Sequence, residues 1–412
     1  MPEYLDVRKA RQQFPALGKK QVYFDNAGGS QVLGSVIQSI TDYLANTNVQ
    51  LGATYPVGQA STTLYNKGCE AAASYINAAA DEVVLGPSTT QLFRNLSQSL
   101  GPLLSAGDEL VISKLDHEAN IASWVTLAEQ KNLTIKWWST ESAVPCHNPK
   151  LTPENLKPLL SSKTKLVTCT HASNILGTIH DIRALADTVH TIPGAMICVD
   201  AVAYAPHRKL DMKALDVDFY SFSWYKVYGP HIANLYAHRR TFDKLASLGH
   251  FFNPTATLEN KLGLAAANYE LVSAIPKVVE YLGGNNSGAF FKEVAEHEGE
   301  LQDVLLSYLN SRDDVTVYGE RSPDPKLRVP TVSFSFKGKN SKEVVERTEA
   351  NSDFGFRWGG FYSYRLIHEI LMPDLPQEAR DLGVIRVSMV HYNTLEEIRE
   401  FVEVLNDTLK NW

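Results

Sequence analysis

Between residues 80 and 240, short β-rich runs alternate with amphipathic segments, and this alternation constrains the fold more than any other feature of the chain. The β-rich runs are 82–86, 109–113, 133–138, 165–170, 195–200, 218–223 and 233–237, and helices are expected over 89–105, 119–131, 153–160 and 181–191. Alternating strands and helices predict a mostly parallel sheet with helices on its faces. Because most runs are almost continuously apolar, we expect strands that are buried on both sides.

The pattern changes after about residue 255. Long helices are predicted over 262–282 and 290–311, followed by β-rich runs at 331–336 and 384–388 and by a last helix over 394–411. A chain of 412 residues is long enough for more than one domain. We therefore predict an α/β protein with a large domain (21–275) built on a mostly parallel seven-stranded sheet. A smaller α+β C-terminal domain (276–412) and an N-terminal segment (1–20) that packs against it complete the chain.

Composition and missing motifs exclude several classes of function. The 39 basic and 46 acidic side chains give a net charge of −7, which disfavours nucleic acid as a partner. No apolar run is long enough to span a membrane, and the polar N-terminus does not resemble a secretory signal. Four cysteines without a CxxC pair favour a cytoplasmic location and no disulfide framework. Phosphate-loop, GxGxxG and HExxH motifs are absent, and adjacent Asp116, His117 and Glu118 would not converge on a metal.

Lys226 is the first residue that indicates chemistry. It follows the run 218–223 and precedes Gly229 and Pro230, so it lies on a loop at the end of a strand, where open α/β sheets bind ligands. Desolvation by its aromatic neighbours would lower the pKa of the amine and make it a nucleophile toward a carbonyl. A solvated surface lysine is the simpler alternative.

Asp200 ends the apolar run 195–200, and a buried carboxylate needs a cationic partner. A pyridinium nitrogen would serve, although a helix cap or a structural ion pair would serve as well. Residues 86–90 (GPSTT) follow another strand and open a helix, which makes either an anion site or an ordinary cap. Arg386 lies in the short apolar run 384–388 and indicates carboxylate binding or a structural salt bridge.

Each of these signals is weak alone, but together they supply what a pyridoxal phosphate enzyme needs. Such an enzyme requires a lysine for the cofactor's aldehyde, an acid for its ring nitrogen, a phosphate cup, a group that stacks on the ring and a carboxylate clamp. Residues 116–117 and 170–174 follow two further strands and would supply groups around the ring.

The same residues resemble the class V aminotransferases, the cysteine-desulfurase-like branch of the fold-type I pyridoxal-phosphate enzymes. The resemblance runs from about residue 22 to 394 and rests on the motifs YFDNAGGS, DHEAN, THASNILG, VDAVA, DFYSFSWYKVYGP and RVSMVHYNT. It implies the fold-type I architecture, pyridoxal 5′-phosphate as cofactor, an amino acid as substrate and a homodimer with active sites at the subunit interface.

The resemblance also implies roles for individual residues. Lys226 would bind the cofactor covalently and move a proton at the substrate Cα, while Asp200 would pair with the ring nitrogen and His117 would stack on the ring. Asn174 would contact the ring's 3-hydroxyl, and Arg386 would bind the substrate α-carboxylate. The phosphate would be held by Thr89, Thr90 and Ser223, with Tyr225 beside it. Asn26 and Ala27 would line the substrate mouth. Arg357 is a candidate for binding a carboxylate of the substrate's side chain, although an exposed surface residue is the simpler interpretation.

The chain also departs from the family. In desulfurases a loop before the final arginine strand carries a catalytic cysteine, whereas here the matching loop, 357–362, has Tyr362 near that place and no cysteine lies beyond residue 198. A persulfide mechanism needs an accessible thiolate, so desulfurase activity is disfavoured. Ala203, Tyr225 and Ala266 replace residues that contact the cofactor in other members, which predicts a reshaped site.

The segments STTQLFR, LTIKWWS, LKPLLSSKTKLVTCTHASN, DTVHTIPG and DFYSFSWYK resemble a fungal branch of this family, the decarboxylating aldolases of the ustiloxin pathway. That branch also lacks the cysteine. This similarity implies a lyase and transferase reaction: β-decarboxylation of L-aspartate, followed by attack on an aldehyde to give a γ-hydroxy amino acid. A C–S lyase acting on a cysteine conjugate is the main alternative. A plain transaminase and a cofactor-free binding protein are less favoured.

Overall fold

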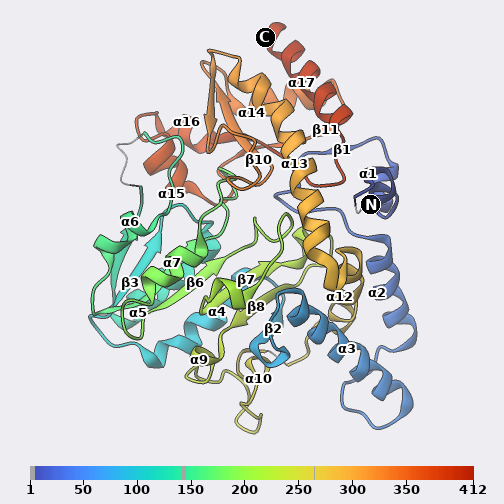
Figure 1. The fold of residues 1–412 in the computed structure, drawn as a ribbon, viewed down its shortest axis with the longest axis vertical. Coiled ribbons are helices and arrows are strands. Elements are labelled where there is room, and N and C mark those ends of the chain that lie inside the picture. Colours follow the sequence, from blue (N-terminus) through green and yellow to red (C-terminus); the bar gives the residue numbers. More distant parts are fainter. Residues whose placement is uncertain (1–4, 141–144, 264) are drawn as a thin grey trace.

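A seven-stranded sheet forms the centre of the larger part of the molecule. The computed structural model describes residues 5–140, 145–263 and 265–412 (Figure 1). Only β8 runs antiparallel to its neighbours in this sheet, which confirms the predicted mostly parallel α/β architecture. In spatial order the strands are β2 (Val83–Gly86), β8 (Ala233–Ala237), β7 (Phe219–Ser223), β6 (Met196–Asp200), β5 (Thr164–Thr170), β3 (Glu109–Ser113) and β4 (Thr134–Trp138).

Both faces of this sheet are covered, as the apolar runs predict. Val111 and Val167 belong to one buried cluster, whereas their chain neighbours Ile112 and Leu166 belong to another on the opposite face. This alternation follows from the two-residue period of a strand. The helices up to residue 242 are α1 (Val7–Gln12), α2 (Gly34–Asn46), α3 (Pro56–Tyr75), α4 (Thr89–Leu100), α5 (Ala122–Lys131), α6 (Pro153–Leu156), α7 (Ile182–Val189), α8 (Met212–Leu215) and α9 (Arg239–Phe242).

The long helix predicted over 262–282 is wrong. Apart from residue 264, which lies outside the described residues, this stretch contains the end of α10 (Leu258–Leu262) and the short helices α11 (Tyr269–Val272) and α12 (Ile275–Tyr281). Gly263 has an extended backbone, and Ala266 is left-handed with φ +59°. The apolar residues of 262–282 are spaced as in one helix, but the backbone leaves the helical conformation between α10 and α11.

A second sheet of four strands lies in the C-terminal part (Figure 1). Its strands, in spatial order, are β12 (Arg357–Gly359), β13 (Val384–Ser388), β10 (Thr331–Phe336) and β9 (Val315–Tyr318), and all neighbouring pairs are antiparallel. A separate buried cluster joins this sheet to α13, α14 and α17. The helices of this part are α13 (Ser287–Asn310), α14 (Ser341–Ala350), α15 (Tyr364–Leu366), α16 (Gln377–Leu382) and α17 (Leu395–Lys410).

The N-terminal stretch contacts the C-terminal part. Strand β1 (Val22–Tyr23) pairs in parallel with β11 (Phe354–Gly355), and Arg11 forms an ion pair with Glu397 at 2.8 Å. The division of the chain at residues 21 and 275 stays a prediction. In the described residues, no helix combines the length and apolar character that a bilayer-spanning segment requires.

Candidate active site

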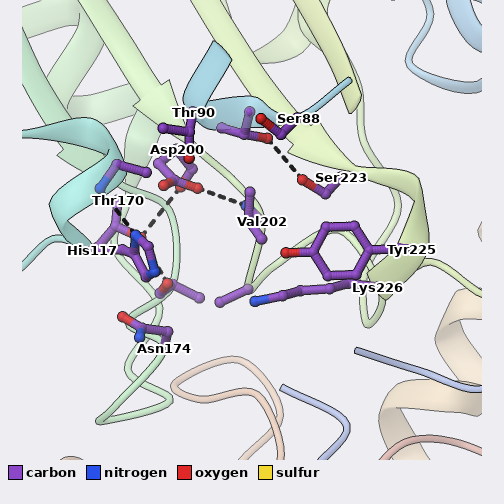
Figure 2. Close-up of a pocket in the computed structure, with 14 residues that line it drawn as sticks. Ser88, Thr90, His117, Thr170, Asn174, Asp200, Val202, Ser223, Tyr225 and Lys226 are labelled. Carbon is purple, nitrogen blue, oxygen red and sulfur yellow. Dashed lines mark hydrogen bonds between the residues drawn. The ribbon is translucent and has the colours of Figure 1, made fainter. Parts of the chain in front are cut away.

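The carboxyl ends of the central strands surround a cavity (Figure 2). Its walls come from the segments that follow β2, β3, β5, β6 and β7, because parallel strands bring their carboxyl ends to one edge of the sheet. The cavity is lined by Ser88, Thr89, Thr90, His117, Ala119, Thr170, Ala172, Asn174, Asp200, Val202, Ala203, Ser223, Tyr225 and Lys226.

Lys226 lies in a single 3₁₀ turn, Trp224–Lys226, directly after β7. Its side chain is buried and its amine points into the cavity in Figure 2. Burial lowers the pKa of the amine to about 8, with a further lowering by the positive charge of Arg386, while Asp200 acts in the opposite direction. A lysine in this setting has an appreciable neutral fraction near neutral pH and can act as a nucleophile.

Asp200 is the last residue of β6 and is buried at the wall of the cavity. One carboxylate oxygen, Oδ1, accepts a hydrogen bond from the backbone N–H of Val202 at 2.9 Å. Burial raises the pKa of this carboxyl to about 6, although the Val202 N–H and the charge of Lys226 favour the ionised form. Within the described part of the chain Asp200 forms no salt bridge, so its charge is available to a cationic ligand.

His117 presents a neutral ring to the cavity. Its Nδ1 accepts a hydrogen bond from the backbone N–H of Ala119 at 3.0 Å, so the proton of the neutral ring lies on Nε2. Burial lowers the pKa of His117 to about 4, and the charges of Lys226 and Arg386 lower it further in the same direction. A flat, uncharged ring fixed by its backbone is suited to stacking on an aromatic ligand.

Asp116 lies behind His117 and is almost fully buried. Its two oxygens accept hydrogen bonds from the Thr170 N–H at 2.9 Å and from the Asn120 side-chain amide at 2.6 Å. Burial raises the pKa of Asp116 to about 8, and the negative charge of Asp200 raises it further. The residue therefore ties the segment after β3 to the end of β5.

Hydroxyl groups gather where helix α4 begins. Thr89 Oγ1 and Ser223 Oγ lie 2.9 Å apart, and Ser88 caps the helix by accepting a hydrogen bond from the Gln91 N–H at 3.1 Å. Tyr225 lies beside Ser223 and faces the same cavity (Figure 2). Hydroxyl donors at the positive end of a twelve-residue helix make a site for a phosphate dianion. Together with Lys226 and Asp200, these residues fit pyridoxal phosphate.

A second cluster of charges lies next to the cavity but does not line it. Asp25 is shared by two guanidinium groups: Arg386 Nη2 is 2.9 Å from Oδ1, and Arg357 Nη1 is 3.5 Å from Oδ2. Arg386 is buried, donates to the Asn174 carbonyl at 3.2 Å and lies 3.7 Å above the ring of Phe361. Arg357 is half exposed. Two cations therefore face one protein carboxylate.

Asn174 joins the cavity to the loop that follows β12. Its Nδ2 donates to the Phe361 carbonyl at 3.0 Å, and its Oδ1 accepts from the Ser363 hydroxyl at 3.0 Å. One hydrogen of the Nδ2 amide remains for a ligand in the cavity. Asn26 is buried and its amide bonds to the carbonyls of Tyr23 and Ser388, so it lies behind the second cluster.

Two other predicted site residues lie outside the cavity lining. The Ala27 N–H donates to the Ser388 hydroxyl at 2.9 Å, which places Ala27 beside β13. His171, within the segment 170–174, turns away from the cavity: it bonds to the Tyr220 hydroxyl at 2.7 Å and stacks on Tyr204 with ring centroids 3.5 Å apart. His171 therefore fixes the wall without facing a ligand.

Sequence reasoning missed Asp25 and Phe361 as parts of the site, and it placed Asp116 near the ring without giving it a role of its own. The motif YFDNAGGS contains Asp25 directly before two proposed site residues, and DHEAN contains Asp116 directly before His117. A carboxylate adjacent to a functional residue was therefore the available signal for both. Phe361 gave no signal, because its contact with Arg386 depends on the conformation of a loop.

No cysteine lines the cavity. Cys169 and Cys198 are buried in strands, and burial raises the pKa of both thiols well above the ordinary value. Burial also raises the pKa of Cys69 to about 12. Cys146 is half-buried, and its N–H donates to the Ile370 carbonyl at 3.0 Å. The described residues thus place no thiolate at the cavity.

The chain belongs to the class V aminotransferase family, whose sequence profile matches residues 22–401. It is a pyridoxal-phosphate enzyme, as the members of this family are.

Two curated fungal proteins are similar over almost the whole chain. The aminotransferase-like protein FGM3 of Gibberella zeae is 52% identical over 407 residues, covering 98% of each chain. The cysteine desulfurase-like protein ustD of Aspergillus flavus is 42% identical, covering 98% of this chain and 90% of its own. The apo cysteine desulfurase of Thermococcus onnurineus has the same fold, with a TM-score of 0.86 at 22% identity over 98% of both chains.

Proposed function

We propose that this enzyme releases the β-carboxylate of L-aspartate as CO₂ and joins the β-carbon to an aldehyde, which gives a γ-hydroxy amino acid. The electron pair left by CO₂ forms the new carbon–carbon bond, and the aldehyde oxygen takes up a proton. The observation that carries the proposal is the pair of arginines, Arg386 and Arg357, that converge on the single carboxylate of Asp25. A substrate with two carboxylates would satisfy both guanidinium groups.

Under this proposal the two arginines have different tasks. Buried Arg386 binds the α-carboxylate, which stays in the product, and Phe361 holds its guanidinium flat. Half-exposed Arg357 binds the β-carboxylate, which leaves. Asn26 and Ala27, which bond to Ser388, support strand β13 at the substrate mouth.

The cavity residues would hold the cofactor and move protons. When bound, pyridoxal phosphate supplies an electron-withdrawing ring that stabilises negative charge on carbons near the substrate amino group. Lys226 would anchor it and carry the proton at Cα, and Asp200 would keep a proton on the ring nitrogen. The remaining contacts would come from His117 on the ring face, Asn174 at the 3-hydroxyl, and Thr89, Thr90, Ser223 and Tyr225 at the phosphate.

We further propose that the working form is a cytoplasmic homodimer, as the resemblance to the family implies. Among the described residues no cysteine lines the cavity, which supports a reaction that does not pass through a cysteine persulfide.

The purified enzyme with its cofactor tests the proposal directly. It is incubated with L-aspartate labelled with ¹³C at the β-carboxyl, with and without benzaldehyde, and CO₂ and products are measured by mass spectrometry. We expect labelled CO₂, alanine without the aldehyde and the γ-hydroxy adduct with it. Pyruvate and thiol from a cysteine S-conjugate, without CO₂ from aspartate, would identify a C–S lyase instead. Oxaloacetate that forms only when a 2-oxo acid is added to accept the amino group would identify a transaminase.

A further inference from the structure

Two consecutive residues in the loop after β12 have left-handed backbones. Phe361 has φ +47° and Tyr362 has φ +59°. For a residue with a side chain this conformation is unfavourable, because the Cβ crowds the following carbonyl oxygen. Strain of this kind persists where surrounding contacts impose it, and such places are often functional.

Four hydrogen bonds impose the conformation. The Glu118 N–H donates to the Tyr362 carbonyl at 2.7 Å, and the Asn174 amide donates to the Phe361 carbonyl at 3.0 Å. Ser363 donates its hydroxyl to Asn174 at 3.0 Å and its N–H to the Gly360 carbonyl at 2.8 Å. Two of these partners, Glu118 and Asn174, belong to segments that line the cavity or adjoin it.

The strained turn directs two aromatic rings to different places. Phe361 is buried against Arg386, so its face is already in use. The ring of Tyr362 lies 5.2 Å from the ring of His117, tilted by 37°, yet 69% of the residue is exposed. Tyr362 thus presents an aromatic face to solvent beside a residue of the cavity wall.

We propose that the ring of Tyr362 is the platform that binds the second substrate, an aldehyde with an aromatic or other flat apolar group. This inference rests on the proposed function, which requires a carbonyl acceptor beside the amino-acid site. The charged groups Arg386, Arg357 and Asp25 bind the amino acid, so the acceptor needs a separate, uncharged surface. The backbone of this exposed tyrosine is held by hydrogen bonds and its side chain has only two torsions, so stacking on its ring costs little conformational entropy.

The Michaelis constants for the two substrates test the platform. With saturating L-aspartate, Tyr362→Ala should raise KM for benzaldehyde about ten-fold, whereas KM for L-aspartate should change less than two-fold. Tyr362→Phe keeps the ring, so KM for benzaldehyde and KM for L-aspartate should both stay within two-fold of the wild-type values. Tyr364→Ala removes a neighbouring exposed tyrosine whose ring makes an edge-to-face contact with His368, and both KM values should again change less than two-fold.

An unchanged KM for benzaldehyde in Tyr362→Ala, an equal rise in Tyr362→Phe, or an equal rise in Tyr364→Ala would overturn the platform. In these cases wild-type enzyme still releases CO₂ from L-aspartate, and the proposed function stands. If wild-type enzyme releases no CO₂ from L-aspartate, the proposed function fails and the platform fails with it. The melting temperature and the cofactor absorbance of each variant show whether it is folded and loaded.

Discussion

At the scale of single residues, the site combines buried charges that have few partners. Asp116 and Asp200 are both buried carboxyls near the end of β5, and burial raises the pKa of each. Lys226 is a buried amine whose pKa is lowered. Such perturbed groups cost stability in the empty protein and are typical of functional sites.

Asp116 should make the stability of the cofactor-free protein depend on pH. Because its pKa rises from about 3.8 to about 8, the folded protein holds this proton more tightly than the unfolded chain does. The contribution of Asp116 to the free energy of unfolding is therefore complete below pH 3.8 and is lost as the pH rises through 8. Between pH 5 and 8 the wild type should lose about 4 kcal/mol of unfolding free energy that Asp116→Asn does not lose, as measured by urea denaturation. Parallel losses in both proteins would show that Asp116 does not titrate in this range.

Substitution of Arg357 and substitution of Arg386 should affect L-aspartate and L-alanine differently. Arg357→Gln removes a half-exposed partner and should raise KM for L-aspartate about ten-fold, without changing exchange of the Cα proton of L-alanine. Arg386→Gln removes a buried partner and should reduce kcat/KM about a hundred-fold or more for both amino acids. Steady-state kinetics and proton exchange followed by NMR measure these effects. Loss of alanine exchange in Arg357→Gln would contradict the division of tasks.

Part of the cavity lining could be predicted from the sequence, while the roles of its residues stay predictions. Lys226, Asp200 and His117 could be placed at one edge of the sheet because each lies at or shortly after the end of a strand whose apolar run is unambiguous. Their convergence on one cavity then follows from parallel topology. The Asp25 ion pairs and the Phe361 contact were out of reach, because they join segments more than 300 residues apart or depend on left-handed residues.

At the scale of elements, the loop after β12 depends on one close approach of backbones. Gly383 has φ +62°, and a Cβ there would lie 2.2 Å from the carbonyl oxygen of Gly359, at the end of β12. Any side chain at this position must therefore push β12 away from β13, which carries Arg386. Glycine is the residue that permits the contact.

Gly383→Ala should destabilise the protein by about 3 kcal/mol and lower kcat/KM for L-aspartate, because Arg357 lies on β12. Gly338→Ala is the matched control: its φ is +72°, but nothing lies within 4 Å of the added Cβ. The control should cost only about 1 kcal/mol and leave kcat/KM unchanged. Urea denaturation and steady-state kinetics test the pair. Equal losses of unfolding free energy in the two variants would show that the close approach of the backbones does not affect stability.

Helices and strands were predicted correctly where the spacing of apolar residues matches the backbone conformation. The predicted strand 109–113 coincides with β3, and the predicted helix 394–411 matches α17 to within one residue at each end. The segment 262–282 failed, because a left-handed Ala266 breaks a stretch whose apolar spacing is helical. Ordinary residues with positive φ leave no mark in a sequence, unlike glycine.

At the scale of the whole molecule, helices α2 and α3 expose apolar side chains. Ile37 and Leu44, seven residues apart and therefore on one face of α2, are 47% and 50% exposed. Tyr55 and Val57 at the start of α3 are exposed as well. A second copy of the chain would cover such a surface, in agreement with the proposed homodimer.

Light scattering should give the mass of two chains, 2 × 45.7 = 91.4 kDa. Replacing both Ile37 and Leu44 by Glu should shift the mass toward that of one chain, because charges would be buried at the interface. Leu103→Glu changes a side chain of similar exposure away from α2 and should leave the mass at two chains. A double variant that keeps the mass of the wild type would place the interface elsewhere.

The central claim is that Lys226 binds the cofactor covalently and carries the chemistry. The direct test is borohydride reduction of the purified enzyme, followed by peptide mapping with mass spectrometry, with Lys226→Ala as the control. The account predicts a reduced pyridoxyl adduct on Lys226 and no CO₂ release from L-aspartate by the variant. An unmodified Lys226, together with CO₂ release that continues in Lys226→Ala, would contradict it.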